Sequence, residues 1–366
     1  MKSYTYGFIG LGLIGASIAK SIRRVYKDCT IIGYNRSEGA RTLALSDGTI
    51  DVATDKIDEN FSKCDYIFLC TPVEYNCEYL KQLKNIIKDD CIITDVGSTK
   101  ESIHKMVSSE GLEKNFIGGH PMAGSEKTGY ENSSDRLVEN AFFAITPTKD
   151  SPREKIDEYK QLVTDIGAIP VILSCEEHDF CVAGISHLPH IIASQLVNLV
   201  HDNDIPSQTM HQLAAGGFKD ITRIASSSSN MWEQICMTNT SNIVTLLDKY
   251  IGLLSKTKYE LEQKNGKYIY DMFTDSREYR DTFEERGHGP IQKTFRLYTD
   301  IIDETGAIAR ISTILALNKI NIKNIGITHN REFQEGVLAI EFESQNDMDM
   351  AKDTLIKFGF TVHNPR

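Results

Sequence analysis

A glycine-rich turn near the N-terminus restricts the fold of this chain more than any other sequence feature. The turn, residues 10–15 (GLGLIG), follows a short apolar run and opens a segment with apolar residues at helical spacing. In such a strand–turn–helix unit, Gly10 permits the tight turn, Gly12 lets a pyrophosphate approach the backbone, and Gly15 brings helix and strand together. Amide groups at the start of the helix then hold the phosphates. We therefore expect a dinucleotide-binding domain; a glycine-rich turn without a ligand is the alternative.

Short β-rich runs alternate with helix-like segments over residues 1–173. The runs cover residues 4–9, 30–34, 65–70, 91–95, 116–119 and 141–146. This alternation is typical of a doubly wound parallel sheet, and continuously apolar runs are typical of strands covered by helices on both faces. The sequence therefore predicts an α/β fold with an N-terminal Rossmann-like domain over residues 1–173.

Strand signals stop after Cys175, and helical patterns continue through Arg286. We expect the last long helix of this part to begin near Thr240 or Ser241. Its apolar residues form a single stripe at helical spacing: Ile243, Leu246, Leu247, Tyr250, Leu253, Leu254 and Leu261. A stripe of this kind indicates core or a subunit interface. An all-α dimerisation domain is expected over residues 174–286, and a homodimer is expected.

The stretch 287–290 (GHGP) interrupts regular structure and marks the second boundary. Strand signals return at residues 294–298, 320–327, 337–342 and 360–362, and two amphipathic helical patterns lie among them. The order βαββαβ predicts a small ferredoxin-like unit over residues 293–366.

The overall composition excludes several classes of protein. With 366 residues, 40% hydrophobic and 25% charged, the chain is ordinary globular protein of two or three domains. A net charge of −11 argues against binding nucleic acid. The apolar start is glycine-rich and lacks a cleavage site, so we expect neither secretion nor membrane insertion. The eight cysteines form no C-x-x-C pair and no zinc pattern, which indicates reduced thiols, a cytoplasmic protein and no metal site.

The position that usually selects the cofactor holds Asn35, Arg36 and Ser37 in place of an acidic residue. Asn35 can bind a ribose, while Arg36 can stack on adenine or meet a 2′-phosphate. NAD is expected, and NADP stays open. The expected cofactor-binding residues are Gly10, Gly12, Leu13, Ile14, Gly15, Asn35, Arg36 and Thr71.

Clusters of reactive residues stand beside glycine or proline at expected strand and helix ends, where sites on such sheets form. They are residues 95–100 (DVGSTK), 119–127 (GHPMAGSEK), and 186–190 (SHLPH) with 216–223 (GGFKDITR). With these motifs the chain resembles the prephenate dehydrogenase family over essentially its whole length. The resemblance implies NAD(P)-dependent oxidative decarboxylation of prephenate to 4-hydroxyphenylpyruvate in tyrosine biosynthesis. Arogenate dehydrogenase is the alternative, because the motifs do not separate the two substrates.

Histidine titrates near neutral pH, so His120 is the expected base or hydrogen-bond acceptor for the hydroxyl at ring carbon C4 of the substrate. By resemblance, Ser98 contacts both this histidine and the reacting hydroxyl. A substrate with two carboxylates needs placed cations, and Arg223 suits a bidentate grip. The resemblance assigns Arg223 to the ring carboxylate and His187 with Lys219 to the pyruvyl side chain. It also places Ser125 and Glu126 in the pocket.

Residues 303–308 and 321–325 resemble the ACT domain, a small amino-acid-sensing module. The resemblance implies that tyrosine is the effector and that Thr305, Gly306, Ala307 and Asn321 surround it. A purely structural module that aids dimerisation is the alternative. For the whole chain, the alternative from a different class is a non-catalytic protein that senses cofactor and amino acid.

Overall fold

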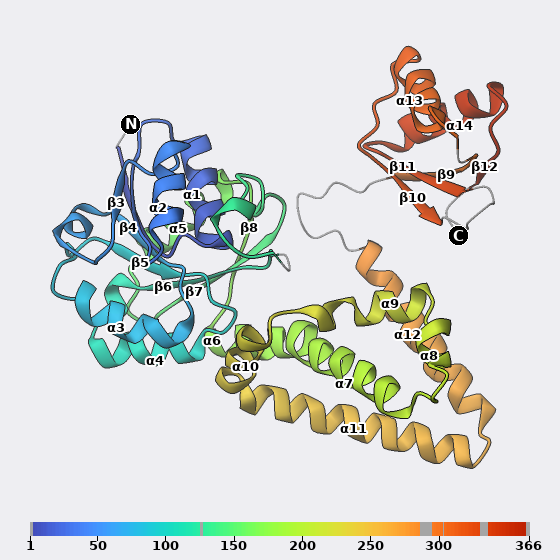
Figure 1. The fold of residues 1–366 in the computed structure, drawn as a ribbon, viewed down its shortest axis with the longest axis horizontal. Helices are drawn as coiled ribbons and strands as arrows, with labels where there is room; N and C mark the ends of the chain where they lie inside the picture. The colour runs from blue at the N-terminus through green and yellow to red at the C-terminus, as the bar shows by residue number, and fades with distance from the viewer. Residues whose placement is uncertain (1–2, 125–126, 286–294, 303, 330–335, 364–366) are drawn as a thin grey trace. The chain divides into compact units, whose positions relative to one another are not determined.

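The computed structural model describes residues 3–124, 127–285, 295–302, 304–329 and 336–363. The chain divides into two compact units, residues 1–265 and residues 266–366 (Figure 1). The expected domain boundaries near residues 173 and 286 stay predictions.

The first unit begins with a five-stranded parallel sheet in the order β3-β2-β1-β4-β5. Its strands are β1 (Thr5–Ile9), β2 (Thr30–Tyr34), β3 (Val52–Thr54), β4 (Tyr66–Leu69) and β5 (Ile92–Asp95). The strand order confirms the predicted doubly wound Rossmann-like fold. The short strand β3 was not predicted, because three residues carry too little apolar pattern to be recognised.

Alternate strand residues pack into two separate cores, one on each face of the sheet. Phe8 and its neighbours pack with helices α1 (Leu13–Val25) and α5 (Arg153–Asp165). Ile9 and its neighbours pack with α3 (Val73–Leu83) and α4 (Glu101–Glu110). Figure 1 shows these helix pairs on opposite sides of the sheet, while α2 (Glu38–Ser46) follows β2. Covered strands explain the continuously apolar runs of the sequence.

A second sheet has the order β6-β7-β8, formed by β6 (Ile117–Pro121), β7 (Phe142–Pro147) and β8 (Ile169–Ile172). A parallel bridge between Ile93 and Phe116 joins its start to the first sheet. Strands β6 and β7 are antiparallel, so the expectation that these two runs extend a parallel sheet is wrong. A parallel return needs a crossover helix, whereas the described part of the β6–β7 connection has only a short 3-10 turn, Tyr130–Asn132.

The rest of the first unit is helical, as predicted. It contains α6 (Cys175–Val182), a π-helical turn (Ala183–His187), α7 (Leu188–Asn203), α8 (Thr209–Leu213), α9 (Gly216–Thr222), a 3-10 turn (Arg223–Ser226), α10 (Ser229–Thr238) and α11 (Thr240–Glu262). Asn239 stands at the N-cap of α11, so neither Thr240 nor Ser241 has the expected capping role. In the stripe of α11, Ile243 is buried while Leu253 and Leu254 are 61% and 52% exposed.

The second unit begins with a further long helix, α12 (Gly266–Glu285), so the expectation that α11 is the last long helix is wrong. The two helices are separated by a left-handed residue, Lys264, at φ 55°. The unit continues with β9 (Phe295–Ile301), α13 (Ala307–Leu317), β10 (Asn324–His329), β11 (Gly336–Phe342), α14 (Gln345–Lys357) and β12 (Val362–His363). These strands form an antiparallel sheet in the order β10-β11-β9-β12. The predicted βαββαβ unit is confirmed, and its ACT-like sheet packs against α13 and α14.

Candidate active site

The glycine turn between β1 and α1 has the geometry of a pyrophosphate cradle. Gly10 adopts φ 105° and donates its N–H to the carbonyl of Tyr34 at 2.9 Å. A Cβ on Gly15 would lie 2.3 Å from the carbonyl oxygen of Gly10, so only glycine allows this close packing. A Cβ on Gly12 would meet no described heavy atom within 4 Å, and α1 has neither a side-chain cap nor an acid in its first turn. The open space at Gly12 and a helix start without a side-chain cap fit a bound diphosphate, which helix amides can hold.

The loop after β2 supports this turn. The side-chain oxygen of Asn35 accepts the N–H of Leu11 at 3.1 Å. The guanidinium of Arg36 lies over the ring of Tyr75, 4.9 Å from its centroid. Thr71 follows β4 and donates its hydroxyl to Asn76 at 3.2 Å. The loop thus presents an amide and a cation at the position where an acidic residue would favour NAD.

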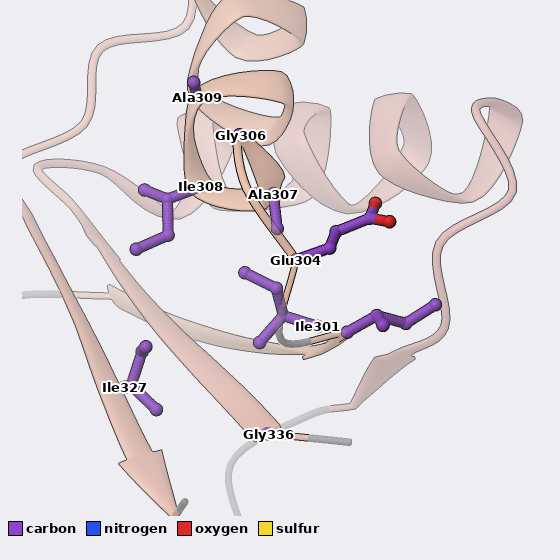
Figure 2. Close-up of a pocket in the computed structure, with 9 residues that line it drawn as sticks. Ile301, Glu304, Gly306, Ala307, Ile308, Ala309, Ile327 and Gly336 are labelled. Atoms are coloured by element: carbon purple, nitrogen blue, oxygen red, sulfur yellow. The ribbon is translucent and has the colours of Figure 1, made fainter. Parts of the chain in front are cut away.

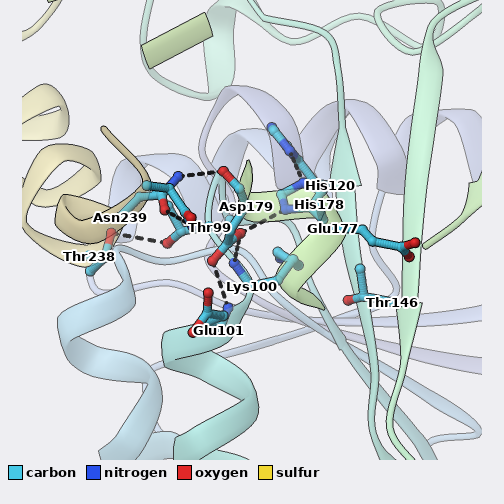
Figure 3. Close-up of polar contacts among 12 residues, drawn as sticks. Thr99, Lys100, Glu101, His120, Thr146, Glu177, His178, Asp179, Thr238 and Asn239 are labelled. Carbon is cyan, nitrogen blue, oxygen red and sulfur yellow. Dashed lines mark hydrogen bonds and ion pairs between the residues drawn. The ribbon is translucent and has the colours of Figure 1, made fainter. Parts of the chain in front are cut away.

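His120, on β6, stands at one end of a hydrogen-bonded chain of three residues in which His178 is the middle member (Figure 3). Its Nδ1 is 2.8 Å from Nε2 of His178, and Nδ1 of His178 is 2.8 Å from Oδ1 of Asp179. Burial lowers the pKa of His120 well below its usual value, and the nearby His178, Lys100 and His187 lower it further. His120 is therefore neutral near pH 7 and able to accept a proton.

Asp179, on α6, is a fully buried carboxylate that joins the helical region to α4. It accepts the backbone N–H groups of Lys100 at 2.7 Å and Glu101 at 2.9 Å, at the start of α4. Burial alone would raise the pKa of Asp179, but the hydrogen bonds from His178 and from these two amides outweigh it, and the pKa is lowered. Asp179 is consequently ionised at neutral pH.

A second buried pair, Lys100 and Asp95, holds the segments that precede His120 and Ser98. Both side chains are fully buried and form an ion pair, and Nζ of Lys100 also donates to the carbonyl of Gly119 at 2.6 Å. Asp95 accepts the N–H of Gly119 at 3.2 Å and that of Gly97 at 2.9 Å. These contacts fix the residues directly before His120 and Ser98. Ser98 itself is half-buried in the loop between β5 and α4.

His187 is buried at the end of the π-helical turn, where Asn239 Nδ2 lies 3.1 Å from its Nδ1. The same amide nitrogen donates to the main-chain carbonyl of Asp179 at 2.7 Å. The predicted base His120 and the predicted substrate ligand His187 thus belong to one network through Asp179.

Aromatic rings extend this network from His187 to His190, whose pKa responds to the nearby Arg223. Trp232 packs edge-on to His187 and stacks on His190 with centroids 3.7 Å apart. Burial lowers the pKa of His190, and the nearby Arg223 lowers it further. Arg223 and Lys219 have exposed side chains at the end of α9. Ser125 and Glu126 lie outside the described residues.

Sequence reasoning missed His178, Asp179 and Asn239, and gave Lys100 and Asp95 no role. The start of α6 was recognisable from its capping box, Ser174 with Glu177. The contact of His178 with His120, however, joins positions 58 residues apart and needs the tertiary fold.

The second unit holds a separate apolar cavity of about 470 Å³ between α13 and the sheet (Figure 2). It is lined by Ile301, Ile302, Glu304, Gly306, Ala307, Ile308, Ala309, Ile327 and Gly336. Gly306 adopts φ 88° as the N-cap of α13, which brings the start of the helix to the cavity. Of the expected effector residues, Gly306 and Ala307 line the cavity, while Thr305 and Asn321 are exposed and lie outside the lining.

Comparison with known proteins agrees with this architecture. Residues 18–172 match the family model of the prephenate dehydrogenase nucleotide-binding domain, and residues 174–275 match that of the prephenate dehydrogenase dimerization domain. A prephenate dehydrogenase from Bacillus subtilis is 36% identical over 348 residues, covering 94% of each chain. The chain belongs to the prephenate dehydrogenase family.

Two solved structures of this family are also similar. Prephenate dehydrogenase from Aquifex aeolicus, in complex with hydroxyphenyl propionate and NAD+, has a TM-score of 0.72 and 31% identity, covering 77% of this chain and 99% of that one. Arogenate dehydrogenase from Synechocystis has a TM-score of 0.69 and 27% identity, covering 76% and 99%. The chain is accordingly an oxidoreductase of tyrosine biosynthesis with prephenate dehydrogenase activity, which sets aside the non-catalytic alternative.

Proposed function

We propose that the chain uses NAD to convert prephenate to 4-hydroxyphenylpyruvate and carbon dioxide, with His120 as the base. The observation that carries the proposal is a half-buried, neutral His120 beside the carboxyl ends of strands that form a dinucleotide cradle. The Aquifex relative, which binds NAD+ and hydroxyphenyl propionate, supports the same cofactor and a substrate of this shape.

The reaction removes a hydride from C4 of the substrate ring and breaks the bond to the ring carboxylate, whose electron pair makes the ring aromatic. When bound, the nicotinamide accepts that hydride. His120 accepts the proton of the C4 hydroxyl as the hydride leaves, and the oxygen regains that proton when the loss of carbon dioxide makes the ring aromatic. Ser98, held by the contacts at Gly97 and Thr99, is the proposed second contact to this hydroxyl.

The two carboxylates of the substrate require positive partners in a chain of net charge −11. We assign Arg223 to the ring carboxylate, and His187 with Lys219 to the pyruvyl group. Ser125 and Glu126 complete the proposed pocket. If Arg223 grips the ring carboxylate, Arg223→Ala raises KM for prephenate strongly, and an unaltered KM would contradict the assignment.

A homodimer is proposed from the apolar surface of the helical region. Within Cys175–Asn203, an apolar window of 18 residues has a mean hydropathy of 1.4, and only 22% of that window is buried within the chain. Its length and composition would also suffice for a membrane span, but its match to a dimerization domain favours a second copy of the chain. All eight cysteines are free thiols, which is consistent with the proposed cytoplasmic location.

We further propose that tyrosine binds the ACT-like unit and inhibits the enzyme. The cavity beside Gly306 is predominantly apolar and has room for an aromatic side chain, and Ala307 opens α13 at its edge. A purely structural role for this unit remains the competing proposal.

One assay tests these proposals together. Formation of reduced cofactor is followed with prephenate or arogenate, each with NAD or NADP, and with or without tyrosine. We expect turnover of prephenate with NAD and inhibition by tyrosine. Turnover of arogenate alone would assign the chain to the other substrate, as in the Synechocystis relative. Inactivity with both substrates would overturn the proposed function, and indifference to tyrosine would leave the ACT-like unit structural.

A further inference from the structure

The two histidines of the active site are both tied to Asp179, but through different atoms. His120 reaches the carboxylate through His178 (Figure 3). His187 reaches the main-chain carbonyl through Asn239. Each hydrogen bond has a donor and an acceptor. Each of these two hydrogen-bonded chains therefore determines which ring nitrogen of its histidine carries the proton.

The first hydrogen-bonded chain, from Asp179 through His178 to His120, starts at a group that can only accept. The ionised carboxylate of Asp179 can only accept, so Nδ1 of His178 carries a proton and donates to it. In a neutral His178 the other nitrogen, Nε2, then accepts. His120 must therefore donate from Nδ1, 2.8 Å away, and its Nε2 keeps a free electron pair. This is the nitrogen a base needs.

The second hydrogen-bonded chain, from the carbonyl of Asp179 through Asn239 to His187, places the proton on the other ring nitrogen. A main-chain carbonyl also only accepts, so the atom of Asn239 at 2.7 Å from it is the amide nitrogen. The side-chain oxygen of Asn239 accepts from Asn242 at 2.8 Å, which fixes the same orientation. The amide nitrogen then donates to Nδ1 of His187, so the proton of a neutral His187 is on Nε2. That nitrogen is a donor suited to an anionic or carbonyl oxygen.

We infer that Asp179 sets opposite tautomers of the two histidines, making His120 a proton acceptor and His187 a hydrogen-bond donor, with His178 and Asn239 as the positioning residues. This inference rests on the proposed function. The arrangement resembles the logic of a serine protease triad, in which a buried aspartate holds the catalytic histidine in its working tautomer. Here one aspartate serves two histidines with different tasks.

The experiment varies His178 and Asn239 and leaves Asp179 in place, because Asp179 also binds the amides at the start of α4. His178→Phe keeps a ring but removes the acceptor for His120, and His178→Gln restores an acceptor. We expect His178→Phe to lower kcat by a factor on the order of 10 to 100, with KM for prephenate changed less than about threefold. His178→Gln recovers part of the rate. His104→Gln on α4, whose histidine contacts Thr146 instead, is the matched control with kcat within about twofold of wild type.

A double-mutant cycle separates positioning from general structural damage. If His178 acts through His120, adding His178→Phe to His120→Asn lowers kcat no further, within about twofold. Multiplicative losses in the double variant would overturn the inference. Equal rates for wild type and His178→Phe would overturn it as well, without affecting the proposed reaction of the wild-type enzyme.

A second experiment tests the proposed tautomer of His187. Asn239→Ala should raise KM for prephenate by about tenfold with kcat lowered by less than about threefold, because His187 loses the donor that fixes its tautomer. A loss confined to kcat would contradict the donor role. Nitrogen-15 NMR of histidine-labelled enzyme provides a direct reading, with Nε2 unprotonated in His120 and protonated in His187. Should His178→Phe fail to fold, His178→Gln and this spectrum still decide the matter.

Discussion

The imidazole of His120 lies among groups that carry or acquire positive charge, namely Lys100, His178 and His187. A proton added to this ring therefore meets both desolvation and repulsion, and the base stays unprotonated through neutral pH. The cost of this environment is lower basicity, but the benefit is that nearly every molecule of the enzyme holds the reactive form at pH 7.

The pH dependence of turnover follows from this environment. Because the pKa of His120 is lowered below 6.5, kcat should stay level as the pH falls from neutral to 6.5 and should decline only at lower pH. Measuring kcat with saturating prephenate over this range checks the prediction. An inflection at or above 6.5 that disappears in His120→Asn would contradict it.

At the residue scale, the sequence identified groups whose chemistry is visible in their type and neighbours. His120 and the glycines of the turn belong to this class, because a motif surrounds them. His178 and Asp179 look like ordinary helix residues in the sequence, and their role arises only where α6 meets α4 and β6. Which histidine acquires which tautomer could not be predicted without that contact.

Among the elements, α4 and the strands β5 and β6 meet at the buried ion pair of Lys100 and Asp95. Charges removed from water must be paired, and the loss of one partner leaves the other uncompensated.

Lys100→Met tests the contribution of this pair to stability. We expect the free energy of unfolding to fall by about 3 to 5 kcal/mol, because Asp95 remains buried without its cation. Chemical denaturation of the whole chain measures the change. Lys105→Met on the same helix removes a lysine whose side chain is 77% exposed, and should change stability by less than about 0.5 kcal/mol. Similar effects of the two substitutions would contradict the structural role of Lys100.

The loop after β2 is the element that selects the cofactor. Arg36→Asp should lower kcat/KM with NADP by about tenfold or more while leaving NAD within about threefold, because a carboxylate repels a 2′-phosphate and binds ribose hydroxyls. The ratio of kcat/KM for the two cofactors is the measurement. An unchanged ratio would show that Arg36 is only a partner of Tyr75.

Elements with a strong periodic pattern were predicted well. Strand pairings and helix ends that depend on the connecting loops were not. The helix expected to follow the glycine turn is found there as α1. The antiparallel β6–β7 pairing depends on the path of the connecting loop, and the separation of α11 from α12 depends on a backbone angle at Lys264. Neither leaves a periodic signal in the sequence.

For the whole molecule, the apolar surface of α11 favours assembly. Leu253 and Leu254 are more than half exposed in a single chain, although the same helix contributes Ile243 to the interior. Exposed leucines in a row are costly in water unless another surface covers them.

Leu253→Glu tests the proposed dimer. A charge buried in an apolar interface should shift the enzyme from dimer to monomer, as measured by light scattering coupled to size-exclusion chromatography. Lys258→Glu, also on α11 with a 79% exposed side chain, should leave the dimer intact. A monomeric wild type, or a Leu253→Glu variant that still dimerises, would place the interface elsewhere.

The position of Asp179 also limits how the enzyme opens and closes. Its carboxylate comes from the helical region, and two of its ligands are main-chain amides of the dinucleotide-binding region. Separating the two regions would leave the buried carboxylate of Asp179 without these donors. This junction is therefore a poor place for a hinge. We therefore expect motions that admit prephenate or release product to bend the chain at other points and to leave these contacts beside the reacting atoms in place.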